Sequence, residues 1–316
     1  MGVREITFMG GETTLRTDVE EIFAFVKKQG MALSFVTNGL RFADPVFAAK
    51  ILKFADFVAI SIHSAEKNMY RALSGIDGFG IFLKGLNHIN MYNRCAALVF
   101  NFVPNSINAS KIVDAIRLIQ KMRWKTRYFF NIKKLMFRGK VRTRPELLLA
   151  DAQLRQHLLR ALAYAAKNRI GMVVDNFPLC IYEGFEYLSL ELVCELLKYR
   201  FIYGNRYLLS KDTTFLRPAT LLERARYLIR CDSCSLKRIC PGVDREYFKA
   251  KDFKCALTPQ KKKLRSVIYD FLRKNLFFNF DYFCHPYRFE ALFGKNGMSA
   301  KYAKALSCQI EEQLLV

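Results

Sequence analysis

Residues 3–39, VREITFMGGETTLRTDVEEIFAFVKKQGMALSFVTNG, contain the repeating unit that decides the fold. Val3–Met9 is an apolar run of strand length, Asp18–Gln29 repeats its apolar residues at helical spacing, and Ala32–Thr37 is a second apolar run. A strand, a helix and another strand in this order favour a βαβ unit with two parallel strands.

The same alternation continues downstream. Strands separated by helices of about ten to fifteen residues predict an α/β fold with a parallel sheet. We interpret Arg127–Ile132 as the last strand of this sheet. The further elements are predicted at Asp44–Phe54 (helix), Phe57–Ile62 (strand), Gly80–Met91 (helix), Ala96–Val103 (strand), Ser110–Met122 (helix) and Arg127–Ile132 (strand).

Polar triplets stand at the ends of three consecutive predicted strands. They are Gly10-Gly11-Glu12, Thr37-Asn38-Gly39 and Ser61-Ile62-His63. Each triplet alone is more typical of a tight turn or of a satisfied polar group than of a ligand site. Because ligands of parallel sheets bind at the carboxyl ends of the strands, the series predicts a ligand site there.

These stretches resemble the radical S-adenosylmethionine (radical SAM) superfamily over roughly residues 3–145. ITFMGGETTLRTDVEEIFAFVKKQGMALSFVTNGL resembles the family's second through third strands, FVAISIHSAEKNMYRALSGIDGFGIFLKGLNHI the next unit, and NFVPNSINASKIVDAI the fifth-strand region. The resemblance implies a partial (β/α) barrel that lacks its first βα unit, followed by a mostly helical C-terminal extension.

The resemblance also implies how S-adenosylmethionine would be held. The GGE loop would receive the methionyl amino group, since a carboxylate pairs with an ammonium and glycines let the backbone approach closely. Thr37 and Asn38 of the second triplet would line the site, and Ser61 and His63 of the third would lie near the ribose. The residues so implied are Gly10, Gly11, Glu12, Thr37, Asn38, Ser61 and His63. No catalytic residue is predicted.

The family's cluster loop, C-x-x-x-C-x-x-C, is not found in these 316 residues, in which the first cysteine is Cys95. In the family, this loop follows the first strand, and its three thiolates hold the [4Fe–4S] cluster that binds the cofactor. We expect the chain to be a fragment that does not cleave S-adenosylmethionine alone. The alternative is a degenerate binding protein that has lost radical chemistry.

A second cysteine group lies in CDSCSLKRICPGVDREYF, with the spacing Cys231-x2-Cys234-x5-Cys240. It resembles the auxiliary-cluster extension of the SPASM or twitch type, although Asp244 stands where the full SPASM core has a further cysteine. Cys180, in NFPLCIYEG, could supply a fourth thiolate. Thiolates suit a [4Fe–4S] cluster and also zinc, and unligated thiols remain a third reading.

The other cysteines have no metal spacing. Two are reserve ligands, of which Cys194 is more typical of a buried helical thiol, and the other is Cys255. The remaining three read as small apolar residues, namely Cys95, Cys284 and Cys308.

Composition indicates a globular chain with a sizeable core, since 52% of the 316 residues are apolar. No apolar run has the length of a membrane span, and no signal peptide is visible, so we expect a cytoplasmic protein with reduced thiols. We predict a barrel part at 1–145, a cysteine-bearing extension at 146–258 and a basic, aromatic helical tail at 259–316.

Charge is concentrated in the middle of the chain. Residues 111–144 contain 12 Lys and Arg against one acid, Asp114. A solvated helix face followed by a basic loop explains this run, and so does an anionic partner such as RNA, a phosphorylated substrate or an acidic peptide. No RNA-binding motif accompanies the run.

The complete protein implied by the resemblance reductively cleaves S-adenosylmethionine to a 5′-deoxyadenosyl radical, which abstracts hydrogen from a substrate. An auxiliary-cluster extension favours a peptide or protein substrate, by family analogy alone. The alternatives are the degenerate binding protein and a basic RNA-modifying relative.

Overall fold

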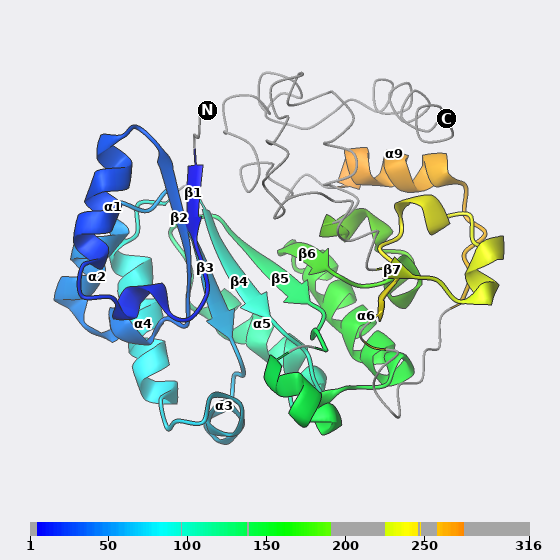
Figure 1. Cartoon of the computed structure of the whole chain (residues 1–316), viewed down its shortest axis with the longest axis horizontal. Coiled ribbons are helices and arrows are strands. Elements are labelled where there is room, and N and C mark those ends of the chain that lie inside the picture. Colours follow the sequence, from blue (N-terminus) through cyan, green and yellow to red (C-terminus); the bar gives the residue numbers. More distant parts are fainter. Residues whose placement is uncertain are drawn as a thin grey trace. The chain divides into compact units, whose positions relative to one another are not determined.

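The computed structural model describes residues 5–95, 97–137, 139–190, 225–245, 247 and 258–274 (Figure 1). The predicted first unit is present as β1 (Glu5–Phe8), α1 (Val19–Lys28) and β2 (Ala32–Thr37). β1 and β2 are parallel, with Glu5 opposite Ala32 and Phe8 opposite Phe35.

A six-stranded sheet with the order β1-β2-β3-β4-β5-β6 forms the centre of the α/β fold. This confirms the predicted parallel, partial-barrel architecture, and the elements predicted up to residue 133 end within two residues of the observed ones. The remaining strands are β3 (Phe57–Ile62), β4 (Ala97–Phe102), β5 (Tyr128–Lys133) and β6 (Gly171–Asp175), and the intervening helices are α2 (Pro45–Leu52), α3 (Lys67–Ser74), α4 (Phe79–Tyr92), α5 (Ile112–Lys121) and α6 (Asp151–Lys167).

The interpretation of Arg127–Ile132 as the last strand is wrong, because β6 extends the sheet beyond it. β6 is only five residues long and follows Arg169, which has a positive φ of 54°. So short an apolar run does not stand out by periodicity alone. The backbone N–H of Lys134 donates to the Asp175 carbonyl at 2.9 Å, where β5 and β6 both end.

The chain divides into two compact units. Unit 1 comprises residues 1–103, 107–131 and 164–171, and unit 2 comprises the rest of the described chain. The candidate cofactor residues all lie in unit 1, and the cysteines at 180 and 231–240 all lie in unit 2. Each unit is therefore considered by itself.

The core of unit 1 begins with aromatic packing between α1 and the first strands. The Phe23 ring lies 5.2 Å from that of Phe8 and 5.3 Å from that of Phe35, measured between ring centroids. Figure 1 shows α1, α2 and α4 grouped beside β1–β3, and α4 contacts the 3-10 helix Leu40–Ala43 that follows β2. This contact fixes the polar turn at the end of β2.

Unit 2 builds its core from α6, the segment after β6, and the cysteine-bearing region. The short strands β7 (Ala225–Arg226) and β8 (Val243–Asp244) pair antiparallel and bracket the residues between them. α9 (Leu264–Lys274) packs on the 3-10 helix Glu186–Leu188. The buried apolar side chains include Leu154, Leu158, Phe177, Leu179, Ile181, Tyr182, Leu236, Ile239, Val243 and Phe271.

Candidate functional site

Glu12 joins the loops that follow β1 and β2. It follows two glycines with positive φ, Gly10 at 91° and Gly11 at 50°, which turn the chain back over the end of the sheet. Glu12 Oε2 accepts the backbone N–H of Asn38 at 2.6 Å, and Oε1 accepts the Thr37 hydroxyl at 2.8 Å. The structure therefore brings Glu12, Thr37 and Asn38 into direct contact.

The Glu12 carboxylate also caps the 3-10 helix Thr13–Leu15. Its Oε1 accepts from the Thr14 backbone N–H at 3.3 Å and from the Thr14 hydroxyl at 2.7 Å. A carboxylate has about four lone-pair positions, two on each oxygen. Oε1 is thus fully used, whereas Oε2, which accepts from Asn38, retains a position for a donor on a ligand.

Ser61 and His63 follow at the end of β3. Residues two apart along a strand point to the same face, so these side chains share one face of the sheet. Burial lowers the pKa of His63, which keeps the imidazole neutral near pH 7. The His63 ring lies 5.9 Å from the Tyr70 ring.

The register of the sheet relates these two groups. Thr37 of β2 pairs with Ile60 of β3, which places Asn38 and Ser61 at the same level on neighbouring strands. Neighbouring strands lie about 4.7–4.9 Å apart. The three predicted triplets therefore occupy one edge of the sheet in unit 1.

Asn108 helps to position the end of the sheet that carries the candidate site, and the sequence interpretation did not identify it. Its amide donates to the His63 carbonyl at 3.1 Å and to the Val103 carbonyl at 3.2 Å, which ties the ends of β3 and β4 together. It is 1% exposed. Its position in an Asn-rich loop after a strand was the signal available, but it does not show which carbonyls the amide reaches.

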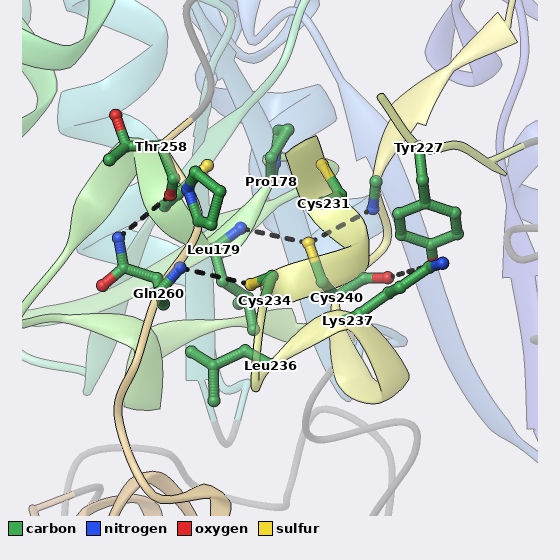
Figure 2. Close-up of a pocket in the computed structure, with 13 residues that line it drawn as sticks. Pro178, Leu179, Tyr227, Cys231, Cys234, Leu236, Lys237, Cys240, Thr258 and Gln260 are labelled. Carbon is green, nitrogen blue, oxygen red and sulfur yellow. Dashed lines mark hydrogen bonds between the residues drawn. The ribbon is translucent and has the colours of Figure 1, made fainter. Parts of the chain in front are cut away.

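Four cysteines of unit 2 line one pocket, and Figure 2 labels three of them, Cys231, Cys234 and Cys240. The four are Cys180, Cys231, Cys234 and Cys240, the four predicted ligands. The 3-10 helices Ile229–Ser233 and Lys237–Ile239 carry or flank three of them, and Cys180 lies in the 3-10 helix Leu179–Tyr182.

Backbone N–H groups from three separate segments point at these sulfurs. Leu179 and Gly242 each donate to Cys240 Sγ at 3.4 Å, and Gln260 donates to Cys234 Sγ at 3.3 Å (Figure 2). Such donors stabilise a thiolate more than a thiol, because they interact with its charge. This shell of donors suits thiolates that ligate a metal.

Burial nevertheless favours the protonated thiol at Cys180 and Cys240. Burial raises the pKa of Cys240 to about 12. Burial also raises the pKa of Cys180 to about 11, and the neighbouring thiols of Cys231 and Cys234 add to the rise. A cationic centre would have to displace these protons, as it does whenever a thiol becomes a metal ligand.

Within the described ranges, no three His, Cys, Asp or Glu side chains converge on a point that could hold a metal ion. The four cysteines therefore share a pocket without enclosing a single ion. The donor set, four soft sulfur atoms, fits an iron–sulfur cluster or zinc chemically. Binding either would require the thiol side chains to turn toward a common centre.

Lys237 lines the pocket, but its ammonium is already paired. Its Nζ lies 2.6 Å from Asp232 Oδ1 and 5.4 Å from the centre of the Tyr227 ring. The Tyr227 hydroxyl in turn donates to the Cys240 carbonyl at 2.7 Å. Asp232 thus partly neutralises the charge of Lys237.

The other sequence candidates have different outcomes. Cys95 is 6% exposed and its pKa is raised to about 12 by burial, as expected of a buried thiol. Asp244 lies in β8. The positions outside the described residues are Cys194, Cys255, Cys284 and Cys308.

The basic run at 111–144 is divided between the two units and is partly neutralised. Lys111 lies 2.6 Å from Glu66, and Lys133 lies 2.8 Å from Asp175. Both acids lie outside the run itself. Across the stretches that the structure describes, no helix has the length and apolar character needed to cross a membrane.

Comparison with known proteins identifies the class of the first part of the chain. Residues 1–126 match the family described as the Radical SAM superfamily. A six-stranded parallel sheet with polar loops at one edge is the corresponding architecture. This part of the chain is thus similar in sequence and in sheet architecture to the radical SAM superfamily.

The similar curated proteins include probable GTP 3′,8-cyclases. That of Thermococcus kodakarensis is 31% identical over 124 residues, which are 38% of this chain and 39% of that protein. That of Saccharolobus solfataricus is 28% identical over 122 residues, with the same two shares. The chain thus matches about two fifths of the length of these relatives.

A solved structure extends the likeness further along the chain. Streptococcus suis SuiB bound to S-adenosylmethionine has a TM-score of 0.50 and 13% identity, covering 80% of this chain and 65% of that one. At this identity the likeness shows the fold alone.

Proposed function

We propose that unit 1 binds S-adenosylmethionine. The observation that carries the proposal is the Glu12 carboxylate, which links two loops and retains an acceptor position on Oε2. That position would accept the methionyl ammonium, with Gly10 and Gly11 allowing close approach. Thr37 and Asn38 would line the same end of the cofactor.

Ser61 and His63 would lie near the ribose. Burial favours the neutral form of His63, in which one ring nitrogen can accept a hydrogen bond from a hydroxyl while the other donates one. Ser61 offers a hydroxyl on the same face. These roles follow the family resemblance, and the register of β2 and β3 supports them by placing Asn38 and Ser61 at one level.

Beside a reduced [4Fe–4S] cluster, S-adenosylmethionine supplies by reductive cleavage the radical that abstracts hydrogen from a substrate. The 316 residues contain no C-x-x-x-C-x-x-C motif to hold that cluster. We therefore expect no 5′-deoxyadenosine from this chain alone after anaerobic iron and sulfide reconstitution. Clear turnover would show that other residues hold the required cluster.

We further propose that Cys180, Cys231, Cys234 and Cys240 hold an auxiliary [4Fe–4S] cluster. Their shared pocket and the N–H donors to Cys234 and Cys240 support this assignment. Zinc is the alternative, and metal analysis separates the two, since only a cluster brings acid-labile sulfide.

The substrate we propose is a peptide or protein. The cysteine-bearing unit 2 supports this by analogy with auxiliary-cluster maturases. The likeness to GTP cyclases covers 38% of this chain, so it says little about substrate choice. Two alternatives remain. The lack of a C-x-x-x-C-x-x-C motif in these 316 residues favours a binding protein without radical chemistry, and the basic run at 111–144 favours an RNA-modifying relative.

Cofactor binding tests the central proposal. Isothermal titration with S-adenosylmethionine is compared for the wild type, Glu12→Gln and Glu21→Gln, the last an identical change at an exposed position of α1. Loss of a hydrogen bond to a charged group should weaken binding about tenfold or more in Glu12→Gln. Glu21→Gln should bind like the wild type. Equal affinity in all three proteins would show that Glu12 does not bind S-adenosylmethionine.

A further inference from the structure

Cys180 is far in sequence from the other three pocket cysteines. Cys231, Cys234 and Cys240 lie within ten residues of one another, bracketed by β7 and β8. Cys180 precedes Cys231 by 51 residues. Closing so long a loop on one centre has an entropic cost, so the position of Cys180 depends on contacts made across unit 2.

Arg155 of α6 makes such a contact with both ends of the Cys180 turn. One guanidinium nitrogen, Nη1, donates to the Cys180 carbonyl, and the other, Nη2, donates to Glu183 Oε2 at 3.2 Å. The two acceptors lie at the second residue and at the C-cap of the 3-10 helix Leu179–Tyr182. The side chain therefore spans this turn from outside.

The same turn also contacts another pocket cysteine. The Leu179 N–H donates to Cys240 Sγ at 3.4 Å, and the flanking side chains of Leu179 and Ile181 are 1% and 2% exposed. Residue 180 is thus bound through its carbonyl by Arg155 and also lines the sulfur pocket. A planar guanidinium can serve both acceptors at once, whereas a lysine ammonium is a single point donor.

We propose that Arg155 is the positioning residue that keeps the Cys180 thiolate in the ligand set of the pocket. The inference rests on the proposed metal function of the four cysteines. The charge of Arg155 is itself paired with Glu183, whose Oε2 lies 3.2 Å from Nη2.

Site-resolved alkylation of the metal-loaded chain tests the proposal. The protein is reconstituted anaerobically with iron and sulfide, exposed briefly to iodoacetamide, and each cysteine is quantified by mass spectrometry. The variants are Arg155→Met, Arg155→Lys and Glu183→Gln, with Arg160→Met as the control at an exposed position of the same helix. Iron and sulfide per chain are measured in parallel.

In the wild type, all four pocket cysteines should be protected relative to the metal-free protein. In Arg155→Met, Cys180 alone should react roughly 10- to 100-fold faster, the range typical of lost outer-shell partners of metal ligands. Arg155→Lys should fall between the two, and Glu183→Gln should resemble the wild type because the bond to the Cys180 carbonyl remains. Arg160→Met should match the wild type.

Other results would overturn the proposal in distinguishable ways. If Cys180 stays protected in Arg155→Met, Arg155 has no positioning role, while the metal site stands. If all four pocket cysteines become reactive together in Arg155→Met and Arg155→Lys, the residue supports the fold and not Cys180. If wild-type Cys180 is unprotected while the other three are shielded, the fourth-ligand assignment fails together with this inference.

Discussion

Helix α4 approaches the end of β2 so closely that a methyl group on Gly85 would lie 2.1 Å from the carbonyl oxygen of Gly39. Gly39 has a φ of 81° and follows Asn38, whose N–H donates to Glu12. The helix is therefore packed directly against the backbone of the candidate cofactor site. A change on α4 that moves this turn should also move the donor to Glu12.

Gly85→Ala should destabilise unit 1 and weaken cofactor binding. Backbone must shift to accept the methyl group, at a cost of about 1–3 kcal/mol. Gly80→Ala is the matched control. Gly80 lies on the same helix, and a methyl group there would meet nothing within 4 Å. Gly80→Ala should stabilise the helix by up to about 1 kcal/mol. Urea denaturation measures both, and a stabilised Gly85→Ala would contradict the packing.

Burial of His63 should make stability depend on pH. Its pKa is lowered in the folded state, whereas in the unfolded chain it is about 6.5. The unfolded state therefore binds the proton more readily, so the contribution is present above about pH 6.5 and is lost as pH falls toward the folded pKa. Between about pH 8 and pH 5.5, the wild type should lose more unfolding free energy than His63→Phe. Equal losses would show that His63 does not titrate differently on folding.

Cys180→Ala and Cys234→Ala should each lower the iron and sulfide bound per chain after anaerobic reconstitution. Each variant removes one sulfur from the shared pocket. Cys95→Ala is the control, because that buried thiol lies in unit 1, apart from the pocket residues. A metal-free wild type would refute the auxiliary site. If only Cys180→Ala were without effect, the fourth ligand would be Asp244, Cys255 or an exogenous group.

The basic run at 111–144 can be tested for anion binding through the salt dependence of its affinity. If it binds nucleic acid, log K should fall with log salt by about 0.9 per phosphate neutralised on duplex, or about 0.7 on single strands. Pairing of Lys111 with Glu66 and of Lys133 with Asp175 predicts a slope smaller than the 12 cations of the run would give. Binding titrations at several salt concentrations provide the slope. No binding at low salt leaves the solvated-face interpretation.

Local patterns predicted the first part of the fold well. Each strand from β1 to β5 is an apolar run followed by a helical period, so Ala32–Thr37 and Phe57–Ile62 coincide with β2 and β3. The polar triplets at their ends were visible for the same reason. β6 was missed because a five-residue run between irregular segments has too little pattern to be distinguished.

Long-range contacts could not be predicted in the same way. The bond from Asn38 to Glu12 joins residues 26 apart, and that from Arg155 to Cys180 joins residues 25 apart. Neither pair has a spacing signature. Gly85 did carry a signal, since a lone glycine inside a helical period often marks a close backbone approach. The sequence does not say which backbone it meets.

Leu179, Gly242 and Gln260, which donate their N–H groups to pocket sulfurs, lie in the turn after β6, in the segment after Cys240 and in the irregular segment leading into α9. Ser235 reinforces the last of these segments, because its backbone N–H donates to the Gln260 carbonyl at 2.9 Å and its hydroxyl donates to the Lys262 carbonyl at 2.6 Å. A metal or cluster bound by the sulfurs would hold these three segments together at one point. The rate of proteolytic cleavage around 258–263 would then report whether the pocket is occupied, because a bound group should slow cleavage in a segment that contains none of the four cysteines.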